Sequence, residues 1–186
     1  ITDKIKVEKL SITDELTQLY NRRYFNVTIE KEFSRAKREN KNLAFVIFDV
    51  DYFKLYNDTY GHLKGDEALK SISQVFSESL HRASDYGFRL GGEEFGILVY
   101  DMDDKHLQKL LKKIQEAIFS LKILHEKNSA CNYVSASYGG LIFKPSDNIT
   151  IEDVYHKADS LLYEVKENGR NNILIKSYCD VWESYR

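Results

Sequence analysis

Cysteine, proline and long apolar runs are scarce in this chain of 186 residues. Its two cysteines, Cys131 and Cys179, lie far apart and outside any C-x-x-C spacing, which argues against a disulfide framework or a zinc site. The only proline is Pro145, so no proline-rich linker divides the chain. No run approaches the roughly eighteen apolar residues that a membrane span requires. We therefore expect one compact domain in a reducing cytoplasm, with no membrane contact made by this chain itself.

An excess of charge of one sign is also absent. Lys and Arg total 27 against 29 for Asp and Glu, which gives a formal net charge of -2. This balance provides no global field that would attract DNA, RNA or an anionic membrane. We expect no nucleic-acid partner, and an anionic ligand would have to be held by a local site.

Hydrophobic periodicity predicts helices and strands in alternation. Helical spacing of apolar residues predicts helices over 24–36, 66–80, 107–121 and 154–165. Strands are predicted at 43–48, 88–90, 95–100, 133–143 and 171–176, with Gly139-Gly140 interrupting the fourth. The run 43–48 is typical of a central strand covered on both faces. Because a glycine turn joins 88–90 to 95–100, we predict an α+β fold, with a mainly antiparallel central sheet flanked by helices.

Acidic side chains are predicted where two of these strands end. The glycine pair of RLGGEEF predicts a tight turn, which places Glu93 and Glu94 at a hairpin tip. Asp49 and Asp51 follow the strand 43–48, and a two-residue period puts both on one face. A divalent cation such as Mg²⁺ would relieve their repulsion and would be completed by substrate phosphates. The alternative is that these acids are ordinary solvated residues of a turn and a strand end.

The segment 57–69, NDTYGHLKGDEAL, is predicted to be a polar loop leading into a helix. An amide such as Asn57 presents both a donor and an acceptor, and a carboxylate such as Asp66 can accept from the N1-H and N2 amino groups of guanine. The alternatives are that Asp66 caps the helix near its positive N-terminal end and that His62 is a structural histidine.

Three cationic residues could serve phosphate groups near these acids. Lys54 follows the acidic strand end, and Lys166 and Arg170 lie at the end of the last predicted helix. Taken alone, each of them is more simply explained as an ordinary surface charge.

Four blocks of the sequence together resemble the GGDEF family of bacterial diguanylate cyclases. They are DELTQLYNRRYF, FDVDYFKLYNDTYGHLKGDEAL, RLGGEEF and ADSLLYEVKENGRN. A lone GGEEF would be weak evidence, whereas four blocks in this order are specific. The resemblance covers about residues 14–176, leaving 1–13 as the end of an upstream linker or coiled-coil helix and 177–186 as a tail without an assigned role. It implies a fold similar to the palm of polymerases and class III nucleotidyl cyclases, and the condensation of two GTP to cyclic di-GMP and two pyrophosphates.

The same resemblance assigns roles to single residues. It implies that Mg²⁺, or Mn²⁺, is held by Asp49, the backbone carbonyl of Val50, Glu93 and Glu94. It implies catalytic roles for Glu93, as the base near the attacking 3′-hydroxyl, and for Lys54. Guanine would be recognised by Asn57 and Asp66, with His62 nearby. The phosphates would be bound by the backbone N-H groups of Tyr52 and Phe53 and by the side chains of Lys54, Lys166 and Arg170.

Partners and regulation also follow from the resemblance. Each domain would hold one GTP, so a homodimer of half-sites would be needed for activity, and an upstream sensor, membrane-anchored or not, would control the pairing. Arg82 and Asp85 match the R-x-x-D inhibitory site of the family, which implies feedback by cyclic di-GMP. The alternative interpretation of these two residues is a polar helix exit.

Three positions depart from the family pattern, and none of them removes a charged or base-reading group. Gln18 replaces a usual glycine, Tyr52 stands where Phe or His is common, and Val165 replaces a small alanine. Asp66 argues against relatives that make cyclic GMP-AMP, which commonly carry Ser there. Two alternatives remain open: a catalytically silent module that binds GTP or cyclic di-GMP, and a nucleotidyl cyclase or polymerase palm acting on other nucleotides.

Overall fold

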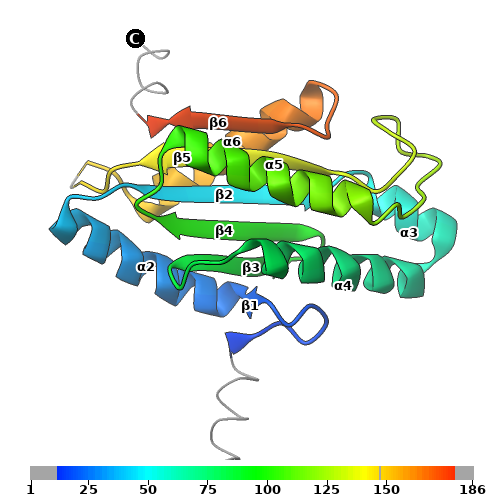
Figure 1. Ribbon diagram of the computed structural model, residues 1–186, viewed down its shortest axis with the longest axis horizontal. Coiled ribbons are helices and arrows are strands. Elements are labelled where there is room, and N and C mark those ends of the chain that lie inside the picture. The colour runs from blue at the N-terminus through cyan, green and yellow to red at the C-terminus, as the bar shows by residue number, and fades with distance from the viewer. Residues whose placement is uncertain (1–11, 147, 179–186) are drawn as a thin grey trace, which may run out of the picture.

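The computed structural model describes residues 12–146 and 148–178 (Figure 1). In chain order the elements are β1 (Tyr20–Asn21), α2 (Arg22–Glu39), β2 (Leu43–Val50), α3 (Phe53–Tyr60), α4 (His62–Ser79), β3 (Asp85–Gly91), β4 (Glu94–Tyr100), α5 (Asp104–Ser120), β5 (Ala136–Phe143), α6 (Ile151–Glu167) and β6 (Ile173–Ser177). The predicted segments 1–13 and 177–186 lie largely outside the described residues, as does Cys179. Cys131 is a free thiol.

The strands form one mixed sheet in the order β1-β3-β4-β2-β5-β6. The central strand β2 is antiparallel to both β4 and β5, and β3 is antiparallel to β4. Parallel pairing is confined to the two edges, where β1 joins β3 and β6 joins β5. All residues of β2 are buried. The predicted α+β fold and the central position of the 43–48 strand are therefore confirmed.

Helices cover both faces of the sheet (Figure 1). Val46 and Phe48 of β2 belong to one hydrophobic cluster, which also contains the apolar residues of α3, α4 and α5. The alternate residues Phe45 and Ile47 belong to a second cluster, with residues of α2 and α6. Side chains alternate across a strand, so a strand that is apolar at every position needs cover on both sides. Among the described residues, no helix is long and apolar enough to cross a membrane.

One predicted interruption of the sheet is wrong. The strand β5 runs without a break through Gly139 and Gly140. A Cβ at Gly139 would lie 2.3 Å from the backbone nitrogen of Leu162 and 2.4 Å from the carbonyl oxygen of Ala158. The glycine is thus needed for the close approach of α6 to the sheet, and it does not mark a turn.

The segment 57–69 also differs from its prediction. It contains the end of α3 and the start of α4, which are joined at Gly61 with φ 88°, rather than a loop. Helix α4 begins at His62, so Asp66 lies more than one turn inside it and neither caps the helix nor lies at its positive end. Gly61 is the N-cap residue and supplies no side-chain hydrogen bond. The sequence pattern missed the start of α4 because this segment is rich in glycine and polar residues and lacks apolar residues at helical spacing.

Candidate active site

The predicted acids meet where β2 runs beside the start of β4. Asp49 pairs in register with Glu94, and the backbone N-H of Val50 donates to the carbonyl oxygen of Glu93 at 3.3 Å. Glu93 lies in the hairpin turn and Glu94 is the first residue of β4. The strand end and the hairpin tip are therefore neighbours, as the sequence predicts.

Asp49 is a nearly buried carboxylate with a cation beside it. Its side chain is 10% exposed, and Nζ of Lys166 lies 2.9 Å from its Oδ1. Burial raises the pKa of Asp49 to about 6, an effect that Lys166 opposes. The negative charges of Glu93 and Glu94 raise this pKa further. A divalent cation would offset both the burial and the repulsion, so this strand end fits the metal that the sequence predicts.

In the described part of the chain, the acidic side chains are not already arranged as a complete set of metal ligands. Within residues 12–146 and 148–178, no three His, Cys, Asp or Glu side chains are grouped closely enough to hold a metal. The expected convergence of three or four carboxylates is therefore looser than predicted. Magnesium keeps few protein ligands and is usually completed by phosphate oxygens, so a loose arrangement agrees with a site that its substrate completes.

The carboxylate of Asp51 is directed to other partners than that of Asp49, contrary to the prediction from the strand period that the two share a cation. Asp51 is 1% exposed and follows the end of β2, where alternation no longer applies. Its carboxylate accepts hydrogen bonds from Oγ of Ser135, Oγ of Ser137 and the backbone N-H of Asn171, at 2.6, 2.6 and 3.1 Å. These neutral donors compensate the buried charge, so Asp51 fastens three chain segments together.

A cleft of about 600 Å³ opens beside these acids. Its lining includes Phe53, Lys54, Asn57, His62, Asp66 and Glu93. The structure thus brings all the predicted guanine-reading side chains together with Lys54 and with one acid of the hairpin.

An unsatisfied acceptor lies in the wall of this cleft. Oδ1 of Asn57 is buried and has no hydrogen-bond partner among the described residues. A Cβ at Gly65 would lie only 1.9 Å from this oxygen, so the glycine makes room for the amide. Buried polar atoms without partners are rare in folded proteins, so this acceptor is an unusual feature of a residue that lines the cleft.

The predicted phosphate-binding cations Lys166 and Arg170 lie near Asp49 and Tyr52 rather than in the cleft lining. The guanidinium of Arg170 is 4.4 Å from the centre of the Tyr52 ring. Its Nη1 donates to the Tyr52 hydroxyl at 3.3 Å and to the carbonyl oxygen of Lys166 at 2.9 Å. The tyrosine that departs from the family pattern therefore holds Arg170 at this end of the sheet.

A further contact was missed by the sequence analysis. Nε and Nη2 of Arg89 donate to the carbonyl oxygen of Gly92, and its Nη1 lies 2.9 Å from Oδ1 of Asp14. Burial alone would raise the pKa of Asp14, but hydrogen bonds from Thr17 and Arg89 outweigh it and lower the pKa. The signal was present in the blocks DELT and RLGGEEF, but sequence alone does not show that the two are joined.

Arg82 and Asp85 adjoin a separate cavity of about 200 Å³, which Lys109 and Lys113 of α5 also line. The backbone N-H of Arg82 donates to Oδ2 of Asp85 at 3.2 Å. Oδ1 of Asp85 is buried without a partner among the described residues. The Arg side chain itself is exposed, and the cavity lining combines basic side chains with the apolar Met102 and Leu110.

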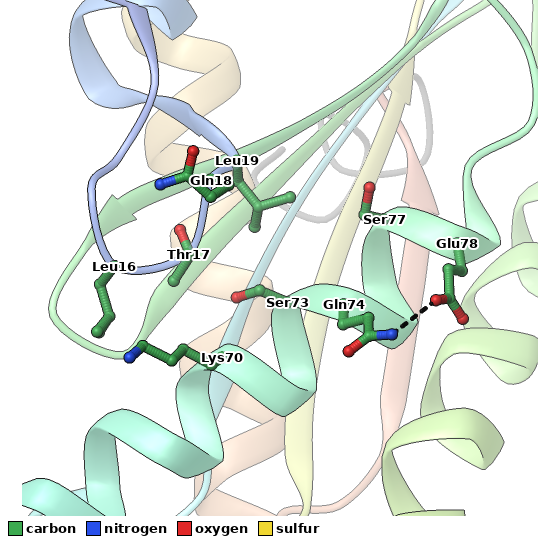
Figure 2. A pocket seen from close by; sticks show the side chains of 9 residues that line it. All are labelled: Leu16, Thr17, Gln18, Leu19, Lys70, Ser73, Gln74, Ser77 and Glu78. Carbon is green, nitrogen blue, oxygen red and sulfur yellow. Dashed lines mark hydrogen bonds between the residues drawn. The ribbon is translucent and has the colours of Figure 1, made fainter. Parts of the chain in front are cut away.

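Figure 2 shows another cleft, of about 420 Å³, between the turn 16–19 and helix α4. Gln18, which has φ 60°, and Lys70 lie on opposite sides of it. None of the predicted catalytic, metal or substrate residues lines this cleft, so it is not the candidate active site.

Comparison with known proteins accords with this geometry. The sequence model described as "Diguanylate cyclase, GGDEF domain" matches residues 11–172. This chain belongs to the GGDEF family. Probable diguanylate cyclase DgcT of Escherichia coli K12 is 32% identical to the GGDEF chain over 173 residues, which cover 92% of the chain and 37% of DgcT.

Two further comparisons show how much of its relatives the chain covers and which fold it shares. A diguanylate cyclase of Vibrio cholerae O1 Classical Ogawa 395 is 36% identical over 181 residues, covering 94% of the chain and 54% of that protein. The chain therefore spans only about a third to a half of these curated relatives. The coiled coil and GGDEF domain of DgcB from Caulobacter crescentus, solved with c-di-GMP, has a TM-score of 0.84 at 24% identity, covering 94% of this chain and 91% of that one. That likeness establishes the fold.

Proposed function

We propose that this GGDEF domain is a diguanylate cyclase, which condenses two GTP molecules to cyclic di-GMP and two pyrophosphates. The observation that carries the proposal is that Asn57, Asp66 and Glu93 line one cleft and that Oδ1 of Asn57 has no hydrogen-bond partner among the described residues. Guanine presents N1-H and N2 amino donors together, and adenine presents no such pair. The cleft therefore favours GTP over ATP.

Charge handling dominates the proposed chemistry. The 3′-hydroxyl oxygen of one GTP forms a bond to the α-phosphorus of the other, while the bond from that phosphorus to pyrophosphate breaks. Glu93 accepts the hydroxyl proton, and repetition with the roles exchanged closes the ring. Transfer of this kind depends on positioning and on stabilisation of developing charge, which are the roles assigned to Lys54, Lys166 and Arg170.

A divalent metal, Mg²⁺ or Mn²⁺, would be held by Asp49, the carbonyl of Val50, Glu93 and Glu94. When bound, it would polarise the phosphate oxygens and lower the pKa of the attacking hydroxyl. In the protein alone, Lys166 partly neutralises Asp49. This lysine can move to a phosphate once another cation compensates the carboxylate.

One domain offers one guanine cleft, so we propose that two copies face each other and each supplies one GTP. Purified chain should be incubated with Mg²⁺ and each of the four nucleoside triphosphates in turn. Mass spectrometry should find cyclic di-GMP from GTP alone, with one pyrophosphate released per GTP, and a chelator should stop the reaction. A rate that rises with the square of protein concentration at high dilution would support the dimer.

The outcomes of this experiment separate the alternatives. If the protein binds GTP saturably but forms no product, the domain is a silent binding module and the proposed enzymatic function is wrong. If a cyclic product forms from another nucleotide, the domain is a nucleotidyl cyclase with a different substrate.

We also propose that cyclic di-GMP inhibits the enzyme through Arg82 and Asp85. The cavity beside them offers cationic groups for phosphodiesters, and Asp85 in its lining is a carboxylate that could accept from guanine donors. Arg82→Ala should keep the initial rate and reduce inhibition by added cyclic di-GMP at least about tenfold. Identical progress curves for parent and variant, with product added, would exclude this site.

A further inference from the structure

The connection between α5 and β5 contacts the turn that carries the proposed phosphate-binding backbone. His125 in this connection is 0% exposed, and its Nε2 lies 3.2 Å from the carbonyl oxygen of Tyr52. Its ring meets that of Tyr56 edge to face, with centroids 5.3 Å apart. The imidazole is therefore enclosed between the connection and the first turn of α3.

The protonation of His125 follows from its surroundings. A carbonyl oxygen only accepts, so Nε2 carries the proton and donates it to Tyr52. Burial lowers the pKa of His125, and its Nδ1 has no partner among the described residues. A neutral imidazole of one tautomer is thus held in place, and it is a donor directed at a single backbone oxygen.

The residue that it contacts has an unusual backbone. Tyr52 has φ 54° and ψ 30°, the left-handed backbone conformation that residues other than glycine rarely adopt. Its carbonyl oxygen also accepts from the backbone N-H of Tyr56 at 2.9 Å. Because the Tyr52 carbonyl points into the helix, the N-H of the same peptide group, that of Phe53, points out of the start of α3, where we place the phosphates of GTP, as the family resemblance implies.

We infer that His125 is a positioning residue for substrate phosphates, because its Nε2-H fixes the Tyr52 carbonyl and thereby the orientation of the peptide groups that begin α3. The inference rests on the proposed function, since it requires that GTP phosphates bind at this turn. His125 itself touches neither the cleft nor the acids. Its contribution is to binding of the triphosphate, and the guanine end of the cleft does not depend on it.

A matched set of variants tests this role. His125→Phe keeps a ring against Tyr56 and removes the donor. In His125→Gln the amide nitrogen reaches about the position of Nε2, whereas the shorter His125→Asn cannot reach it. Leu124→Ala is the control from the same connection, because the Leu124 side chain is uncharged and 48% exposed.

The measurement compares two ligands in the presence of Mg²⁺: α,β-methylene-GTP, which cannot react, and guanosine, which has no phosphates. His125→Phe should bind the triphosphate analogue about tenfold more weakly and guanosine as the parent does. His125→Gln should recover most of the loss, His125→Asn should not, and Leu124→Ala should match the parent. If the Phe variant does not fold, as judged by circular dichroism, the Gln and Asn pair decides by the same criterion.

Two results would overturn the inference. Unchanged affinity of His125→Phe for the analogue would show that the hydrogen bond is not needed, and equal losses for the analogue and for guanosine would show a general structural effect. A parent protein that binds neither ligand would instead contradict the proposed function, so the two failures are distinguishable.

Discussion

Two turns form the proposed catalytic end of the sheet, and they are held in different ways. The β2 turn, Asp51–Tyr52, is fixed by buried neutral donors from Ser135, Ser137 and Asn171 and by the imidazole of His125. The hairpin turn, 91–93, is more exposed; its carbonyl groups accept from the side chain of Arg89 at Gly92 and from the backbone N-H of Val50 at Glu93. The first turn is part of the core, and the second is attached to the surface segment that contains Asp14.

The difference indicates where each turn can adjust. Several short hydrogen bonds to a buried carboxylate leave the β2 turn one arrangement, which suits a binding site whose geometry must exist before the substrate arrives. The link from the hairpin to the segment that contains Asp14 is a partly exposed ion pair of Arg89, and such pairs contribute modestly. Motion of the segment 14–19 would therefore reach the proposed base, Glu93, more readily than it would reach Asp51.

The largest effect is expected from the acids of the hairpin turn and of β4. Glu93→Gln and Glu94→Gln should each lower cyclic di-GMP synthesis by about a thousandfold, because charge stabilisation is lost without loss of volume. Turnover of purified variants, with folding checked by circular dichroism, measures this. Asp101→Asn, at the far exposed end of the same hairpin, should retain the parent rate. Near-parent turnover by either Gln variant would remove that acid from the mechanism.

The next effect concerns the β2 turn. Asp51→Ala should lower the free energy of unfolding by about 3 kcal/mol, because two buried hydroxyls and one partly buried N-H lose their acceptor. Urea denaturation measures this, with the exposed Asp58→Ala as the control. A loss within about 0.5 kcal/mol would mean that the donors find water or other partners and that the turn is less rigid than its contacts indicate.

A smaller coupling is expected between the hairpin turn and the N-terminal segment. Asp14→Ala, Arg89→Ala and the double variant form a cycle in which the interaction energy should be about 1 kcal/mol, since the two side chains are 26% and 15% exposed. Raising the salt concentration should reduce the coupling. Strictly additive losses would show that Arg89 acts through Gly92 alone.

The smallest effect is a pH dependence at the β2 turn. Burial lowers the pKa of His125 in the folded protein, so the unfolded chain takes up this proton first as the pH falls. The contribution to stability is complete above about pH 6.5 and is lost as the pH falls from there towards the lowered pKa. Denaturation midpoints at several pH values should show a shallower decline over that range for His125→Gln, and parallel curves would contradict the assignment.

The same dipeptide, Gly-Gly, shows how far local sequence can be interpreted. At Gly91-Gly92 it marks a turn, as predicted, with φ 49° at Gly92. At Gly139-Gly140 the prediction of an interruption failed, because the reason for Gly139 is the backbone of α6, which is distant in sequence. A local pattern identifies a permissive backbone, and it does not say whether conformation or close packing requires it.

The sequence by itself determined the alternation of elements, the central buried strand, the hairpin and the family, because apolar periodicity and motif blocks are local properties. It also predicted which side chains read guanine or hold a metal, and these roles stay predictions. Only the tertiary structure decided that Asp49 pairs with Lys166, whereas Asp51 accepts from Ser137 of β5 and from Ser135 just before it. It also decided that His125 contacts the carbonyl oxygen of Tyr52. These assignments depend on contacts between segments some 70 to 120 residues apart, which no local pattern contains.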